Sequence, residues 1–214
     1  MNLSVFGKSV KGVDHQFNED AMLIDKKKNL FVVADGVTLP RGGKEAAVHS
    51  CKYLQKFFKS DKQLLDCFLE VNDQILKDKE KNVMGYTTLT AVHVNDNVIK
   101  IANVGDSPVY LANGEKIFRM TGNDRIFGTA SLAQAIGQEN LNIHYSEEKF
   151  GAGMYVVIAS DGITDMMSKD EIYQLIKKHK IPRNIVAAIV KKASERPTIY
   201  NDDKTLIILQ MKEK

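Results

Sequence analysis

Short apolar runs and longer helical stripes divide this chain into predicted strands and predicted helices. Apolar residues in short runs or at alternate positions predict strands, whereas apolar residues three and four apart predict amphipathic helices. The predicted strands are residues 3–11, 21–25, 30–34, several within 86–120, 141–146, 155–159 and 205–211. The predicted helices are residues 44–59, a helix that follows Asp61, a helix that Ser168 caps and that ends before Pro182, and a helix that Pro182 opens.

The connections between the predicted strands indicate antiparallel sheets. Residues 86–120 form consecutive strands, with Asn95-Asp96 and Asn113-Gly114 as hairpin turns. This segment has no room for a crossover helix, which argues against a doubly wound parallel sheet. Helices stand between groups of strands, so we expect a layered α+β domain with strands packed on strands and helices outside.

Several predicted strands carry a carboxylate at one end. Residues 31–36, FVVADG, and residues 155–162, YVVIASDG, are apolar runs that end in Asp-Gly. One such ending is ordinary turn chemistry, but the pattern recurs across the chain. The carboxylates at strand ends are Asp35, Asp161, Asp106 after residues 101–105, Asp202 and Asp203 before residues 205–209, and Glu19 and Asp20 before residues 21–24.

Carboxylates gathered at adjacent strand ends are typical of a site for hard divalent cations. Mg²⁺ and Mn²⁺ prefer oxygen ligands, and carboxylates without a cation repel one another and raise each other's pKa. Two such ions about 3.5 to 4 Å apart can activate a water and hold a phosphoryl group for in-line attack. The residues therefore suggest a metal-dependent phosphohydrolase, if these strand ends meet in space.

Composition excludes some other classes. The chain has 214 residues, 43% hydrophobic and 27% charged, with a net charge of +3, as expected for a single globular domain over residues 1–214. Basic residues are interspersed with acidic ones, so we expect no nucleic-acid partner. No apolar stretch is long enough for a membrane span and no signal peptide is visible, so we expect a cytoplasmic protein. Cys51 and Cys67 lie on predicted helices without CxxC spacing and are expected to be reduced core thiols.

Seven short motifs occur in order along nearly the whole chain. They are Asn18-Glu19-Asp20, Ala34-Asp35-Gly36, Gly85-Tyr86-Thr87, Asn103-Val104-Gly105-Asp106-Ser107, Ala135-Ile136-Gly137, Ala159-Ser160-Asp161-Gly162 and Asp202-Asp203-Lys204-Thr205. Together these motifs resemble the metal-dependent PP2C (PPM) family of serine/threonine phosphatases, in its small bacterial form.

The resemblance implies a four-layer α-β-β-α sandwich with two Mg²⁺ or Mn²⁺ ions at one end. It implies that Asp35 bridges the ions, that the Gly36 carbonyl binds one, and that Asp161 and Asp202 bind the other. Hydroxide held by the ions would attack phosphorus directly. Glu19 and Asp20 would act through metal-bound waters, and Asp106 with Asp161 matches positions linked to a third, weaker metal. Asp203 stands where the family usually has Asn.

The sequence also departs from the family pattern. The family usually places a phosphate-binding arginine where this chain has His15; His15 could donate to phosphate or could be structural, and Arg41 is a candidate substitute. Val37 replaces a histidine proposed as general acid in eukaryotic members. The flap segment, residues 121–137, is about half the length found in typical bacterial members, which predicts a more open cleft.

Three functions remain open from the sequence. The first is a phosphoprotein phosphatase that acts as a monomer on phosphoserine and phosphothreonine placed by a serine/threonine kinase. The second is a weakly active or inactive PP2C-like regulatory protein, which His15 favours and the intact set of Asp35, Asp161 and Asp202 disfavours. The third, a receiver-type phosphoacceptor domain, predicts alternating strands and helices, which residues 86–120 contradict.

Overall fold

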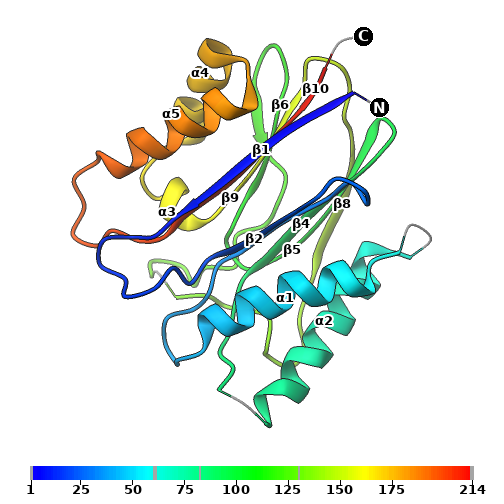
Figure 1. Ribbon diagram of the computed structural model, residues 1–214, viewed down its shortest axis with the longest axis vertical. Helices are drawn as coiled ribbons and strands as arrows, with labels where there is room; N and C mark the ends of the chain where they lie inside the picture. Colours follow the sequence, from blue (N-terminus) through cyan, green and yellow to red (C-terminus); the bar gives the residue numbers. More distant parts are fainter. Residues whose placement is uncertain (1, 60–61, 82, 130, 213–214) are drawn as a thin grey trace.

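The chain folds into two antiparallel sheets that pack face to face (Figure 1). The computed structural model describes residues 2–59, 62–81, 83–129 and 131–212. One sheet, the β1 sheet, has the order β1 (Leu3–Val10), β10 (Lys204–Met211), β9 (Tyr155–Ala159), β6 (Val109–Ala112), β7 (Ile117–Arg119). The other, the β2 sheet, has the order β2 (Ala21–Asp25), β3 (Leu30–Ala34), β4 (Leu89–Asn95), β5 (Val98–Val104), β8 (His144–Lys149).

Helices cover the outer face of each sheet, so the predicted four-layer α+β sandwich is confirmed. Helices α1 (Gly43–Phe57) and α2 (Leu64–Lys79) lie on the β2 sheet, and α3 (Asp161–Thr164), α4 (Lys169–His179) and α5 (Pro182–Ser194) lie on the β1 sheet (Figure 1). Three buried apolar clusters fill the spaces between the layers, and the central one includes Phe31, Ile101, Val156 and Ile207. Burial of this apolar surface is what holds the layers together.

Most of the strand pairing expected from the sequence is present. β2 pairs with β3 across the turn of residues 26–29, with Ala21 opposite Ala34. β4 with β5 and β6 with β7 form the two predicted hairpins. These hairpins belong to different sheets, because the chain passes from the β2 sheet to the β1 sheet between β5 and β6. The Ser168 hydroxyl accepts from the amide N–H of Glu171, as the predicted capping box requires.

The strand predicted at residues 141–146 is wrong in position. The structure has β8 at His144–Lys149, where Asn103 pairs with His144 and Val98 with Lys149. Leu141 and Ile143 pack against the cluster beneath α1 and α2 and stay outside the sheet. The prediction relied on these apolar residues. The observed strand is instead polar and lies at the edge of the sheet, where polar strands are common. Asp61, after which a helix was predicted, lies outside the described residues.

Two further expectations from the sequence concern the cysteines and membrane-spanning helices. Cys51 and Cys67 are buried and free, as predicted. In the part of the chain that the structure describes, no helix combines the length and the apolar composition that crossing a bilayer requires.

Candidate metal and phosphate site

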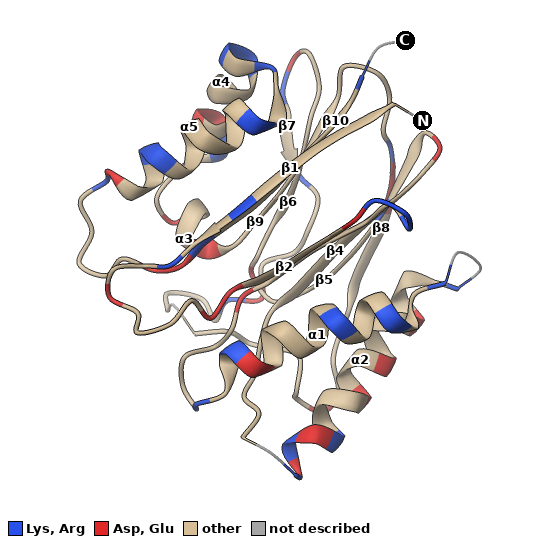
Figure 2. Cartoon of the chain, viewed as in Figure 1, with Lys and Arg blue, Asp and Glu red and all other residues tan. Residues whose placement is uncertain are grey.

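Acidic strand ends from both sheets meet at one end of the sandwich. Asp35 follows β3, Asp106 follows β5 and Asp161 follows β9, and Asp202 precedes β10. All of them line one cleft of about 650 Å³. The cleft is also lined by Gly36, Val37, Thr38, Leu39, Pro40, Tyr86, Thr88, Ser131, Leu132, Ala135, Gln138 and Tyr200. The convergence that the sequence could only suppose is therefore present, and acidic segments lie where the two sheets meet beside α3 (Figure 2).

The backbone at Asp35 is held by two threonines from the segment before β4. Thr88 donates its N–H to the Asp35 carbonyl at 2.8 Å, and its hydroxyl accepts from the Asp35 N–H at 3.0 Å. Thr87 also donates its hydroxyl to the Asp35 carbonyl at 2.8 Å. At Gly36, a Cβ would lie 2.6 Å from the Glu19 carbonyl oxygen and 2.7 Å from that of Gly43. Only glycine allows these chain segments to pass so closely, which fixes where Asp35 points.

Close backbone packing also brings Asp161 toward Asp202. A Cβ at Gly162 would lie 1.9 Å from the Asp203 carbonyl oxygen, so the first turn of α3 rests directly on the chain that enters β10. Asp161 is the first residue of α3, and Asp202 stands two residues before β10. The two Asp-Gly motifs therefore use glycine for the same purpose, which is to let a neighbouring backbone approach the acidic residue.

Asp20 lies behind the cleft with one oxygen unpaired. The Ser160 hydroxyl donates to Asp20 Oδ2 at 2.9 Å and accepts from the N–H of Thr205 at 2.9 Å. Asp20 Oδ1 is buried and has no hydrogen-bond partner. A buried carboxylate oxygen without a partner is costly, and burial raises the pKa of Asp20 to about 7.

The other carboxylates in the cleft are perturbed in the same direction. Burial and the charges of neighbours, Asp20 first, raise the pKa of Asp35 well above its usual range. Burial and Asp106 raise the pKa of Asp161 to about 7, and burial raises that of Asp202. Within the described residues, no basic side chain pairs with Asp35. This donor set of hard oxygens, with one oxygen orphaned, fits Mg²⁺ or Mn²⁺.

One basic side chain does reach into the cluster. Arg125, from the flap segment, donates from Nε to Asp106 at 2.5 Å, from an Nη to Asp161 at 2.7 Å, and to both oxygens of Asp165 at 3.0 Å. Burial disfavours the charge of Arg125, but the hydrogen bonds that Arg125 donates to Asp106 and Asp165 outweigh this effect and raise the guanidinium pKa further. Arg125 therefore neutralises one side of the carboxylate cluster.

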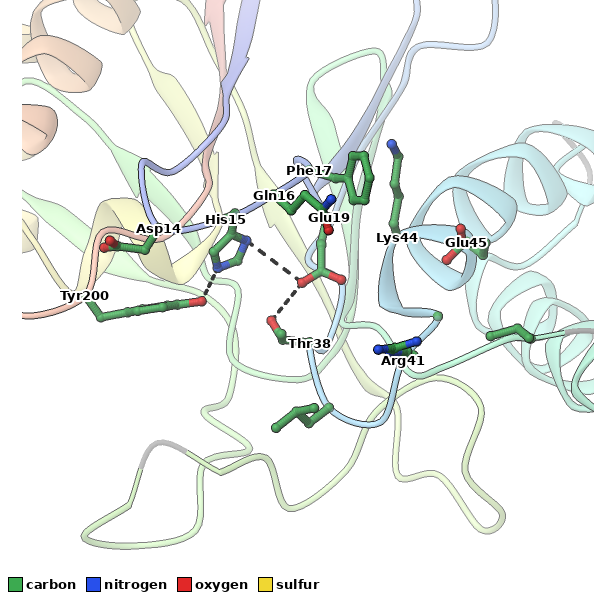
Figure 3. A pocket seen from close by; sticks show the side chains of 13 residues that line it. Asp14, His15, Gln16, Phe17, Glu19, Thr38, Arg41, Lys44, Glu45 and Tyr200 are labelled. Atoms are coloured by element: carbon green, nitrogen blue, oxygen red, sulfur yellow. Dashed lines mark hydrogen bonds and ion pairs between the residues drawn. The ribbon is translucent and has the colours of Figure 1, made fainter.

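A second pocket of about 540 Å³ lies next to the cleft and contains the predicted phosphate-binding residues. His15, Glu19 and Arg41 line it together with Lys44 and Phe17 (Figure 3). Thr38, Leu39 and Tyr200 line both the pocket and the cleft, so the two are adjacent. The Thr38 hydroxyl donates to Glu19 Oε2 at 2.8 Å. Arg41 therefore lines a pocket next to the acidic cleft and not the cleft itself.

His15 is nearly buried, and both of its ring nitrogens contact protein groups. Nδ1 lies 2.9 Å from Asp203 Oδ2, and Nε2 lies 3.2 Å from Asp202 Oδ1 and hydrogen-bonds the Tyr200 hydroxyl. Asp203 also accepts from the N–H groups of Gly12 and Glu19, both at 2.7 Å. His15, Asp202 and Asp203 are close enough to hold an ion together. The backbone donors on Asp203 instead make this cluster a support for the chain around Glu19.

Sequence reasoning missed Arg125, Tyr200, Thr87 and Thr88 as parts of this site. Thr87 was visible only as one residue of a family motif, and its role depends on the pairing of Gly36 with Thr87 across the sheet end. For Arg125 a signal existed: Asp106, Asp161 and Asp165 needed a cation, and the flap contained an arginine. Only the folded path of the flap shows that this arginine reaches them.

The architecture and the acidic end of the sandwich together define the PP2C class of phosphatase domain. The family model described as Stage II sporulation protein E (SpoIIE) matches residues 30–212. The chain therefore belongs to this family, and its resemblance to the bacterial PPM phosphatases is confirmed.

Individual relatives agree with this membership. The chain is 24% identical over 213 residues to "Probable protein phosphatase 2C 71" of Arabidopsis thaliana. The match covers 80% of this chain and 46% of that protein, so this chain spans about half of the relative's length. It is 24% identical over 217 residues to "Serine/threonine phosphatase stp" of Listeria monocytogenes, covering 85% of this chain and 86% of the relative. The catalytic domain of the serine/threonine phosphatase PstP, solved with two manganese ions, has the same fold, with a TM-score of 0.82, 21% identity and 99% of both chains covered.

Proposed function

We propose that this chain is a Mg²⁺- or Mn²⁺-dependent phosphoprotein phosphatase that hydrolyses phosphoserine and phosphothreonine. The observation that carries the proposal is the convergence of Asp20, Asp35, Asp161 and Asp202, with raised pKa values and the unpartnered Asp20 Oδ1. Such a set is unfavourable alone and is stabilised by divalent cations. The manganese in the PstP structure supports the same choice of metal.

The residues of this chain would take different roles in metal binding and hydrolysis. Asp35, the Gly36 carbonyl, Asp161 and Asp202 would hold two ions, with Glu19 and Asp20 acting through water. When bound, the ions would lower the pKa of a water nucleophile and neutralise charge on the phosphoryl group. Val37 carries no proton to donate, so the leaving oxygen would be protonated from solvent.

Arg41 would bind the phosphate beside these carboxylates. Both nitrogens of His15 already contact protein groups, so a contact of His15 with phosphate would have to replace one of these. Arg41 lines the adjacent pocket, and a guanidinium can donate two parallel hydrogen bonds to a phosphate. The substrate would be a phosphoprotein made by a serine/threonine kinase, and we expect the enzyme to act as a monomer.

The test is hydrolysis of p-nitrophenyl phosphate and of a phosphothreonine peptide with Mn²⁺ and with EDTA. Activity should require the metal, and Asp161→Asn should lower it by about 100-fold or more, because it removes a charged ligand from the site. Asp170→Asn, on the exposed start of α4, is the matched control and should keep full activity. A wild type that is silent with every metal would favour the PP2C-like regulatory protein.

Arg41 is tested separately by kinetics with the phosphopeptide. Arg41→Ala should raise KM about tenfold with a smaller change in kcat, because it removes a hydrogen-bonded contact to a charged group. Lys44→Ala removes another positive charge from the same pocket and serves as the control. An unchanged KM for Arg41→Ala, or an equal rise for Lys44→Ala, would remove the specific role of Arg41.

A further inference from the structure

Arg125 divides the carboxylate cluster into two halves with different charge balance. Its guanidinium hydrogen-bonds Asp106, Asp161 and Asp165, so the three carboxylates on this side share one fixed positive charge. The Arg125 side chain is 21% exposed and that of Asp106 is 5% exposed, so the contact is shielded from water and salt.

The other half of the cluster is Asp20, Asp35 and Asp202, and among the described residues no arginine or lysine pairs with these side chains; His15 Nε2 lies 3.2 Å from Asp202 Oδ1. Arg125 does not contact Asp20, Asp35 or Asp202, and in the described part of the chain Asp35 has no basic partner. Asp161 stands between the halves, because Arg125 binds only its Oδ2. External cations are therefore needed on the side of Asp20 and Asp35, whereas the side of Asp106 and Asp165 is already compensated.

The flap holds Arg125 in this position. Asp124 accepts from the Gly105 N–H at 2.8 Å, from Gln134 Nε2 at 2.7 Å, and contacts His144 Nε2 at 2.7 Å. Gly105 directly precedes Asp106, so the residue before Arg125 is tied to the residue before its carboxylate partner. The flap therefore presents Arg125 to the cluster at little further entropic cost.

We propose that Arg125 is a built-in cation that occupies the space between Asp106 and Asp161, so that the cleft takes two divalent ions and excludes a third. This inference rests on the proposed function, because it concerns the same metal site. The guanidinium fills the space between Asp106 and Asp161, and its positive charge would repel a divalent ion placed there. Without Arg125, Asp106, Asp161 and Asp165 would leave three carboxylates facing one space, which is a fitting donor set for Mg²⁺ or Mn²⁺.

The count of bound ions tests the proposal without measuring activity. Equilibrium dialysis against Mn²⁺, with the metal quantified in each chamber, should give two ions for the wild type and three for Arg125→Ala. Arg125→Gln is a second variant that keeps more of the side-chain volume, in case the alanine variant does not fold. Arg183→Ala, at the start of α5 and outside the cleft, is the control and should bind two.

Hydrogen exchange reports whether Mn²⁺ displaces Arg125. The Ile126 N–H donates to the Ser131 carbonyl at 2.8 Å, so its protection follows the integrity of the flap. Protection of this amide should be unchanged by Mn²⁺ in the wild type and should fall about tenfold or more in Arg125→Ala, where the flap loses its anchor.

The outcomes separate this inference from the proposed function. Three ions in the wild type, no gain in either Arg125 variant, or loss of Ile126 protection when Mn²⁺ binds to the wild type would each overturn the inference. Two ions in both the wild type and the variants would overturn it and leave the phosphatase proposal intact. A wild type without bound ions would contradict the proposed metal dependence and the expected count of two. An ion gained by Arg125→Ala would then still show that Arg125 excludes an ion from the side of Asp106.

Discussion

Without divalent metal, the folded protein should lose stability as the pH rises toward neutrality. Burial raises the pKa of Asp20 and that of Asp161 to about 7, from the ordinary value of 3.8 for an aspartate. The folded state therefore binds their protons more tightly than the unfolded chain does. The resulting stabilisation is fully present below about pH 4 and is lost as the pH rises through about 7.

The size of the effect follows from linkage. For one carboxyl with these two values, the free energy of unfolding falls by about 2 to 3 kcal/mol between about pH 5 and about pH 7.5. The two carboxyls interact, so their joint effect is about 2 to 5 kcal/mol rather than a strict sum. Acids with lowered pKa values, such as Asp25 and Glu171, change charge mostly below this window and contribute little within it.

The titration of His93 changes the stability in the opposite direction, so its contribution has to be separated from that of the carboxyls. Burial lowers its pKa, so the unfolded chain binds its proton more tightly and stability rises with pH near its titration. Comparison of the wild type with Asp20→Asn removes this contribution, because both proteins contain His93. The asparagine can still accept the hydrogen bond that Ser160 donates to Asp20.

Urea unfolding in EDTA, monitored by circular dichroism at several pH values, measures the effect. The wild type should be less stable at about pH 7.5 than at about pH 5, and Asp20→Asn should show a flatter dependence by about 2 kcal/mol. Added Mn²⁺ should restore stability at the higher pH, because it binds the ionised carboxylates of the folded state only. Equal pH dependence in the two proteins would refute the reasoning about Asp20.

Two further predictions concern the scaffold of the site. Gly162→Ala should destabilise the protein by about 3 kcal/mol or more, because its Cβ would lie 1.9 Å from the Asp203 carbonyl oxygen. Gly114→Ala is the matched control, because no atom lies within 4 Å of the Cβ that it would add. Equal melting temperatures for the two variants would contradict this prediction. Ser168→Ala should lower the free energy of unfolding by about 1 kcal/mol through loss of the α4 cap, without affecting Mn²⁺ binding. Thermal and urea unfolding measure both.

The sequence predicted the layers and the acidic strand ends because these signals are local. A run such as residues 30–34 shows both its burial and its Asp-Gly ending within a few positions. The role of Arg125 could not be predicted in this way, since it depends on how an irregular segment folds back over β5 and α3. The same holds for Asp202 and Asp203: adjacent in sequence, one lines the cleft and the other accepts backbone N–H groups behind it.

Two departures from the PP2C pattern are linked by a direct contact between the two residues concerned. The sequence showed His15 where the family usually has a phosphate-binding arginine and, far away, Asp203 where it usually has Asn. The structure places His15 Nδ1 2.9 Å from Asp203 Oδ2. A buried carboxylate needs more donors than an amide does, and the imidazole supplies one. With His15 committed to Asp203, phosphate binding would have to come from another cation, for which we propose Arg41 in the adjacent pocket.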